Sequence, residues 1–428
     1  MLKKVISVLL VVVLALSLCA CAKAKDYPYG PVAGGANASD AVENNGSFVV
    51  KKGDYIYFIN SSEATTADNE LGKSTRGALM RAKADGSDVV AVFPKLVANT
   101  SGTGLYIFGD TIYFTSPCDE TNSKGKVQNS YLDVMSVKLD GTGAKKHATL
   151  GSTSYQMMFV EEDGVVYAIY VNDGVIYSLK LDGEANNKPQ SIASGYTSAL
   201  FSENGVIMVK SDNNVQTVML VKGSGEVTEL FNGNENGRKY TYTLVKLENG
   251  RLFYRKTDSV VTLEDSLCMR DNNGAGAEKK LLENYSYSFV TTTYPSEGII
   301  ASVTSLGTVF VPFDGGEIKQ LRTGTTSSLI KSEGKYLYYG STSSSVLTLY
   351  RYSIDELLEG KGVSVQFLVL SEETDEEGKV TTTYDTAYAS PFGAAFVNGK
   401  LYYFSNVSEG VKVLKSYDGE KISTLGVA

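Results

Sequence analysis

A glycine turn followed by an aromatic or aliphatic strand recurs eight times along this chain of 428 residues. Clear copies read "GDYIYFI" (53–59), "GDTIYFT" (109–115) and "GKLYYFS" (399–405). The turn glycines are about 49 residues apart on average, a period typical of repeat architectures. They are Gly53, Gly109, Gly164, Gly205, Gly250, Gly298, Gly334 and Gly399.

Each repeat contains the signals for four short antiparallel strands. An apolar segment precedes the glycine turn, and the aromatic strand leads to a third strand that ends in a second turn, as in "VMSVKLDG" (134–141) and "IYSLKLDG" (176–183). Asp-Gly between apolar runs is a strong hairpin signal, because both residues accept positive φ angles. Four such strands per period predict an all-β fold, a β-propeller of four-stranded blades. Eight copies favour eight blades; the weaker fourth to sixth copies leave seven open.

The aromatic strand and the "DG" hairpin resemble those of YWTD-type propellers of low-density-lipoprotein-receptor-related proteins, with "IYF" or "LYY" in place of "YWTD". From about residue 47 the chain is similar to a bacterial lipoprotein family of unknown function that carries such propeller-like domains. The resemblance implies a propeller fold and an envelope location. It implies no activity, because fold does not determine function.

The N-terminus has the pattern of a secretory signal. Lys3 and Lys4 precede the apolar run "VISVLLVVVLALSL" (5–18), which is too short for a convincing membrane span. "LCAC" (18–21) resembles a bacterial lipobox, which implies lipid attachment at Cys21 after removal of residues 1–20. We therefore expect an exported protein anchored by lipid to the outer face of a bacterial cell membrane. Ordinary secretion with a free Cys21 is the alternative.

Composition suggests three further expectations about the mature chain. Residues 21–46 lack apolar periodicity, so we expect the lipidated cysteine and a flexible tether there, and a single propeller domain over 47–428. Loss of Lys3 and Lys4 takes the net charge from −8 to −10, which argues against a nucleic-acid partner. Membrane attachment would then depend on the lipid, and we expect a monomer.

Three insertions are the candidate site. Residues 61–77 and 116–130 lengthen the connection between the second and third strands of the first two repeats, and residues 371–390 join the seventh repeat to the eighth. These repeats are neighbours in a closed ring, so we predict that the insertions share one sector. Neutral loop drift is the alternative. The candidate binding residues are Glu63, Asp68, Arg76, Asp119, Lys124, Tyr384, Asp385 and Tyr388.

The inventory of catalytic residues is small. His147 is the single histidine and is expected on an outer strand, so a histidine metal cluster is excluded, and no cofactor is expected. Cys118 and Cys268 are expected to be free thiols. The acidic run 372–377 is read as a solvated hairpin tip in preference to a cation site. Carboxylates gathered from distant blades in a central funnel stay open as an enzymatic possibility.

Local patterns give three more structural expectations. "SIDELLEG" (353–360), with a capping box of Ser353 and Glu356, predicts one turn of helix. The ring should close by packing between the first and last blades, unless part of 22–46 adds a strand. Tyrosines of the repeated strands should pack between blades and not contact a ligand: Tyr55, Tyr57, Tyr113, Tyr338 and Tyr402.

These observations favour a membrane-anchored propeller that binds a protein, peptide or glycan without catalysing a reaction. The alternatives are an envelope hydrolase or lyase and a structural or sensory module of a lipoprotein complex.

Overall fold

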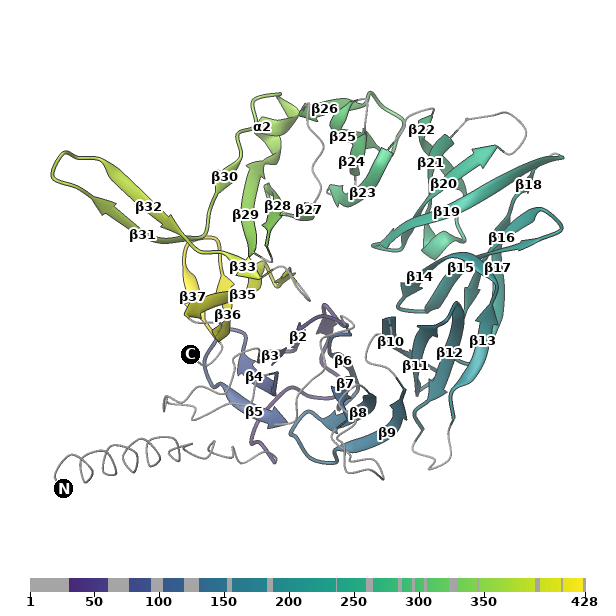
Figure 1. The fold of residues 1–428 in the computed structure, drawn as a ribbon, viewed down its shortest axis with the longest axis horizontal. Coiled ribbons are helices and arrows are strands. Elements are labelled where there is room, and N and C mark those ends of the chain that lie inside the picture. Colours follow the sequence, from purple (N-terminus) through teal and green to yellow (C-terminus); the bar gives the residue numbers. More distant parts are fainter. Residues whose placement is uncertain are drawn as a thin grey trace, which may run out of the picture.

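The computed structural model of the chain is a ring of antiparallel sheets (Figure 1). Each sheet follows the previous one along the sequence, and the last sheet packs beside the first. The chain is therefore a β-propeller. The structure describes residues 31–60, 77–93, 103–118, 131–151, 156–182, 188–235, 237–258, 265–283, 287–294, 297–303, 306–322, 329–344, 346–388, 393–408 and 411–425.

Eight four-stranded blades can be traced in these residues, each with its strands in sequence order from the inner to the outer edge of the ring. Blade 1 consists of β2 (Val49–Lys52), β3 (Tyr55–Ile59), β4 (Leu79–Lys83) and β5 (Val90–Phe93), and blade 2 of β6 (Tyr106–Phe108), β7 (Thr111–Pro117), β8 (Leu132–Lys138) and β9 (Lys145–Leu150). Blade 3 consists of β10 (Gln156–Glu162), β11 (Val165–Asn172), β12 (Val175–Lys180) and β13 (Gln190–Ser194), and blade 4 of β14 (Tyr196–Ser202), β15 (Gly205–Asp212), β16 (Val215–Val221) and β17 (Val227–Asn232). Blade 5 consists of β19 (Arg238–Glu248), β20 (Arg251–Asp258), β21 (Asp265–Arg270) and β22 (Glu278–Glu283), and blade 6 of β23 (Tyr287–Tyr294), β24 (Gly298–Val303), β25 (Gly307–Pro312) and β26 (Lys319–Arg322). Blade 7 consists of β27 (Leu329–Glu333), β28 (Tyr336–Ser343), β29 (Val346–Ser353) and β30 (Val365–Gln366), and blade 8 of β34 (Ala394–Val397), β35 (Lys400–Ser408), β36 (Val411–Tyr417) and β37 (Ile422–Thr424).

A few short elements are added to the blades. They are β1 (Val42–Glu43), β18 (Asn234–Glu235), η1 (Asn272–Gly274), α2 (Ile354–Leu358), β31 (Val369–Thr374), β32 (Val380–Tyr384) and β33 (Ala387–Tyr388). The expected helical turn is confirmed as α2, and the Ser353 side chain caps it by accepting a 3.4 Å hydrogen bond from the Glu356 amide. Within the described residues, no helix is long and apolar enough to cross a membrane.

The turns between the first two strands of a blade have the predicted chemistry. Asp163 and Gly164 have φ angles of 50° and 78°, and Asn249 and Gly250 have 50° and 71°. Positive φ at both central positions is the requirement of the type I′ turn, whose twist matches that of the flanking strands. These local signals explain why the repeat could be recognised in the sequence.

Apolar side chains fill the interfaces between consecutive blades. Tyr57 and Tyr402 are buried in a cluster shared by blades 8, 1 and 2, and Tyr338 is buried in the cluster between blades 7 and 8. Tyr55 and Tyr113 are partly buried against their clusters. The prediction that tyrosines of the repeated strands pack between blades is therefore confirmed.

The ring closes by packing between the first and last blades. The rings of Phe48 and Phe404 have centroids 4.9 Å apart, and Lys400 Nζ donates a 3.1 Å hydrogen bond to the carbonyl oxygen of Ala84. The added strand β1 pairs with β2 of blade 1 and not with blade 8. In the described residues closure therefore depends on side-chain contacts, as expected.

Residues 31–46, which we call the strap, do not form the flexible tether suggested by their composition. The Val32 amide donates a 2.8 Å hydrogen bond to the carbonyl of Asp140, and β1 adds to the inner edge of blade 1. Lys52 is almost fully buried, and its Nζ donates to the carbonyls of Ala38 and Asp40 at 3.0 and 2.7 Å. The second half of the predicted tether is thus bound to the propeller.

Arg81 makes the other main contact with the strap. Its side chain is 1% exposed, and Nη1 and Nη2 donate to the carbonyls of Gly34 and Ala33 at 2.7 and 2.9 Å. Gly35 has φ of 122°, and a Cβ atom there would lie 2.9 Å from Nη1 of Arg81. A larger residue would therefore be strained and would push against the guanidinium.

Candidate functional site

A two-stranded hairpin projects from the ring between blades 7 and 8 (Figure 1). It is made of β31 and β32, and in the described part of the chain these strands pair only with each other. The hairpin lies within the insertion 371–390 and its preceding residues. An isolated two-stranded hairpin is marginally stable in water. A hairpin that extends away from the scaffold therefore calls for a functional explanation.

The register places the apolar strand residues of the hairpin, apart from Leu370 in the bulge, on one of its two faces. Val369 pairs with Tyr384 and Thr374 pairs with Val380, with a bulge between Val369 and Ser371. Because side chains alternate along a strand and paired residues share a face, Val369, Val380 and Tyr384 lie on one face, together with Glu372, Thr374 and Thr382. Ser371, Glu373, Thr381 and Thr383 lie on the other.

Exposed apolar side chains are frequent in the hairpin and in the residues that precede it along the chain. Among the described residues, eight large hydrophobic side chains are exposed, and six of them lie between residues 346 and 380. Val380 is 56% exposed and Leu370 is 50% exposed. Scattered exposed apolar residues are ordinary, but a cluster of them marks an interaction surface. The six are Val346, Val363, Val365, Val369, Leu370 and Val380.

The hairpin tip is strongly acidic and exposed. Residues 375–379 form the turn, in which Asp375 Oδ1 accepts hydrogen bonds from the amides of Glu377 and Lys379 at 3.0 and 2.8 Å. The reading of the acidic run as a solvated hairpin tip is therefore confirmed. The tip therefore places negative charge beside the exposed apolar side chains of the hairpin.

A buried ion pair fixes the base of the hairpin to blade 8. Asp385 is 6% exposed and accepts hydrogen bonds from Tyr403 Oη, Ser405 Oγ and Lys415 Nζ at 3.0, 2.7 and 2.8 Å. Its amide donates to the carbonyl of Leu368, the residue before β31. Burial and the Asp385 carboxylate raise the pKa of the Tyr403 phenol well above its usual value, so the phenol stays a hydrogen-bond donor.

The structure places three of the predicted site residues. Tyr384 ends β32 and is half-buried, and Tyr388 lies in β33, which joins β29 of blade 7 to β35 of blade 8. Asp385 is buried, so it supports the hairpin and does not face a ligand. The other predicted residues, Glu63, Asp68, Arg76, Asp119 and Lys124, lie outside the described residues, as does Cys21. The shared sector of the three insertions stays a prediction.

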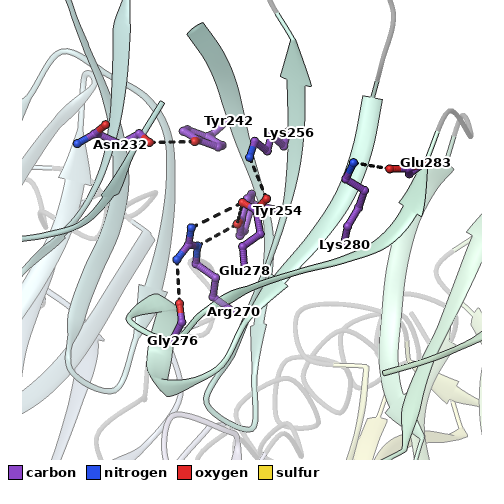
Figure 2. A network of polar contacts seen from close by, with 9 residues as sticks. All are labelled: Asn232, Tyr242, Tyr254, Lys256, Arg270, Gly276, Glu278, Lys280 and Glu283. Carbon is purple, nitrogen blue, oxygen red and sulfur yellow. Dashed lines mark hydrogen bonds and ion pairs between the residues drawn. The ribbon is translucent and has the colours of Figure 1, made fainter. Parts of the chain in front are cut away.

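A second polar cluster, not expected from the sequence, joins three strands of blade 5 (Figure 2). Glu278 on β22 accepts from Tyr254 Oη and Lys256 Nζ, both on β20, at 2.6 and 2.8 Å. Arg270 on β21 donates through Nε to Tyr254 Oη at 3.0 Å and through Nη1 to the Gly276 carbonyl at 2.8 Å. The guanidinium also lies 4.2 Å from the ring centre of Phe231 in blade 4.

The protonation states of this cluster suit a structural role. Burial would raise the pKa of Glu278, but hydrogen bonds from Lys256 and Tyr254 outweigh it and leave the pKa below its usual value. Burial raises the pKa of the neighbouring Cys268 thiol to about 12 and that of Tyr254 far above its usual value. Tyr254 is fully buried. The cluster therefore holds a charged carboxylate and protonated neighbours inside the interface of blades 4 and 5.

The histidine and the thiols lie where the sequence suggested. His147 is on β9, the outermost strand of blade 2, with Nε2 2.8 Å from Ser136 Oγ and its ring stacked on Tyr113. Burial and nearby Lys145 lower its pKa to about 4. Cys118 and Cys268 are buried free thiols, as predicted. Among the described residues, no group of three or more potential metal ligands is found.

No protein-family model matches the chain, and no curated protein does. Solved structures that resemble it include BamB from Moraxella catarrhalis, with 13% identity, coverage of 89% of this chain and 99% of that one, and a TM-score of 0.40. The β-propeller domain of the Trilobed protease from Pyrococcus furiosus has 14% identity, coverage of 74% and 93%, and a TM-score of 0.38. A puromycin-hydrolyzing peptidase of Mycobacterium tuberculosis has 12% identity, coverage of 75% and 52%, and a TM-score of 0.41, so the chain spans about half its length. Because these identities and TM-scores are low, the assignment of a propeller fold is based on the arrangement of sheets in this chain and not on the solved structures.

Proposed function

We propose that the chain is an exported, lipid-anchored β-propeller that binds a protein partner through the hairpin of β31 and β32, without catalysing a reaction. The single observation that carries this proposal is the exposed apolar surface of the hairpin, formed by Val369, Leu370 and Val380, three of the eight exposed large hydrophobic side chains among the described residues. Covering even part of such a surface is favourable, at about 25 cal/mol per Å² of apolar area.

The shape and chemistry of the surface favour a protein over a small ligand. Sites for small molecules are concave and enclose most of the ligand, whereas this hairpin is a convex projection. Its exposed side chains are mainly aliphatic, such as Val369, Leu370 and Val380, and not the aromatic platforms suited to a sugar ring. The buried ion pair of Asp385 and Lys415 holds the base of the hairpin in place. A partner would therefore meet a largely preformed surface, which lowers the ordering cost of binding.

The bound strap also limits how far the propeller can sit from the membrane. If Cys21 carries the lipid, only residues 22–30 separate it from the strap. Nine residues, whatever their conformation, cannot span more than about 30 Å. The proposed anchor would thus keep the propeller close to the membrane surface, and the hairpin would meet partners at the cell envelope.

Binding is tested by capture from an envelope extract with the immobilised mature chain. The double substitution of Leu370 and Val380 to serine should abolish capture of a specific protein, because it removes the two most exposed large apolar side chains of the hairpin. The matched control is Val227→Ser, which changes a valine of similar exposure (51%) on β17 of blade 4 and should leave capture intact. Equal capture by all three chains would contradict the proposal.

The lipid anchor is tested separately. Cys21→Ala should move the protein from the membrane fraction to the soluble exported fraction and abolish labelling by a radioactive fatty acid. Cys19→Ala is the control, because Cys19 would be removed with the signal and its loss should leave labelling intact. Membrane association that survives Cys21→Ala would overturn the anchor.

A further inference from the structure

We infer that the free edge of β32 receives an extended segment of a basic partner protein as a third strand of the hairpin sheet. This inference rests on the proposed function and specifies how the partner binds. Addition of a strand to an exposed sheet edge is a recurrent mode of peptide recognition, in which main-chain hydrogen bonds supply affinity and side-chain positions supply specificity.

The hydrogen-bond pattern shows which backbone groups β32 offers. The Asp375 amide donates to the Lys379 carbonyl at 3.1 Å, and the Asp385 amide donates to the Leu368 carbonyl at 2.7 Å. Residues 379 and 385 therefore direct their backbone groups toward β31, and so do the odd-numbered residues between them. Val380, Thr382 and Tyr384 direct their N–H and C=O groups to the free edge.

The two edges of the hairpin differ in their protection against pairing. β31 has a bulge between Val369 and Ser371 and carries Glu372 and Glu373, both of which are features that discourage a further strand. β32 reads "VTTTY", with no lysine, proline or bulge, and its β-branched residues have high strand propensity. Natural proteins usually block an exposed edge. The unblocked edge of β32 therefore indicates a strand-accepting role.

A third strand would also complete the apolar face. Val380 and Tyr384 lie on the same face as Val369, so alternate side chains of an added strand would pack beside them. Three strands with an apolar face are more stable than two. Val380 and Tyr384 thus offer both free backbone groups and apolar contacts.

Charge specifies the chemistry of the partner segment. Between residues 369 and 384 there are five carboxylates and one lysine, so the hairpin carries a net charge of −4. A second copy of this acidic chain would bring like charges together, whereas lysine or arginine residues of a partner would be attracted. The expected segment alternates aliphatic or threonine residues with basic ones.

The probe is a synthetic peptide of sequence KVTVKVTV, added to the full mature chain and followed by fluorescence anisotropy and by hydrogen exchange. Binding should protect the amides of residues 380, 382 and 384. Thr382→Pro removes one edge donor without removing a bond to β31 and should weaken binding about tenfold, while Thr382→Ser should bind like the native chain. Of two KVTVKVTV peptides that are N-methylated at the two alternate sets of residues, the one methylated at the N–H groups that would face β32 should not bind, and this result needs no protein variant. The acidic peptide EVTVEVTV should not bind either.

Three outcomes would overturn the inference: no protection of these amides, undiminished binding of both methylated peptides, or self-association of the chain through β32 in sedimentation. Failure here is distinguishable from failure of the proposed function. If envelope capture still depends on Leu370 and Val380 while the peptides do not bind, the partner uses the apolar face without adding a strand. If capture is also independent of these residues, the proposed function fails as well.

Discussion

Replacement of Arg81 by methionine should release the strap from blade 1. The guanidinium donates two hydrogen bonds, to Gly34 and Ala33 at 2.7 and 2.9 Å, and lies 5.0 Å from the ring centre of Tyr55. A hydrogen bond to a charged group contributes about 1.5–3 kcal/mol net, so loss of two weakens strap docking by about 3 kcal/mol at the low end. This corresponds to about a 100-fold larger population of the undocked strap. Methionine keeps the unbranched, apolar first part of the side chain and removes the guanidinium, whose buried Nε–H has no hydrogen-bond partner among the described residues.

Limited proteolysis of the mature chain with a broad-specificity protease measures this change. Cleavage within residues 33–41 requires the strap to undock, and its rate follows the undocked population when redocking is faster than cleavage. Lys51→Met is the control, because Lys51 forms a partly exposed ion pair with Glu43 that is worth at most about 1 kcal/mol. Its cleavage rate should rise less than about fivefold. If Arg81→Met is cleaved no faster than Lys51→Met, the buried cation does not hold the strap.

Three further predictions concern stability. Asp385→Ala should lower the free energy of unfolding by about 3–5 kcal/mol, because Lys415 is left buried without its carboxylate. In chemical denaturation the exposed control Thr381→Ala should change this free energy by less than about 0.5 kcal/mol. Equal effects of the two substitutions would refute the role of Asp385 in holding the hairpin. The native pKa of Glu278 lies below 4.5, so the contribution of its carboxylate to stability is complete above that pH and is lost as the pH falls through the native pKa. Glu278→Gln should therefore destabilise the protein at pH 7 and destabilise it less at pH 3. A loss of stability that is equal at both pH values would contradict a charged Glu278 in the cluster. The native pKa of His147, about 4, lies below the unfolded value of 6.5, so the unfolded chain binds the proton first and stability falls as the pH drops from 6.5 to 4. In a profile of thermal midpoint against pH, His147→Gln should flatten the slope over this range. An unchanged slope would contradict a neutral, buried His147 ring.

The repeat could be read from the sequence because its signals are local. A glycine or an Asp-Gly pair with positive φ, such as Asp163 and Gly164, specifies its turn independently of the rest of the fold. Burial of tyrosines such as Tyr57 follows from their position in a strand that must pack between two sheets. Eight blades and closure by packing follow from the same local pattern.

The strap and the polar clusters depend on contacts that the sequence does not display. Gly34 is bound by Arg81, which is 47 residues away, and the Gly- and Ala-rich composition of the strap gives no apolar signal. Tyr254, Arg270 and Glu278 meet only because three strands of blade 5 pair in a particular register. Asp385 looked like an exposed loop residue because its partners Tyr403 and Lys415 come later in the chain.

The hairpin could be predicted from the sequence only in part. Its acidic tip is visible in the sequence, but the apolar face that joins Val369 to Val380 and Tyr384 depends on the bulge after Val369. Without the bulge, Val369 would lie on the opposite face from Val380, and no apolar surface would be recognised.

Site-specific photo-crosslinking in intact cells identifies the proteins that contact the hairpin. A benzophenone amino acid placed at position 380 in the hairpin, or at position 227 in blade 4, reports which proteins lie against each surface. One dominant crosslinked protein is expected from position 380, joined through an extended segment that contains basic residues, and none in common is expected from position 227. No crosslinked protein from position 380, or the same products from both positions, would contradict a partner-binding hairpin.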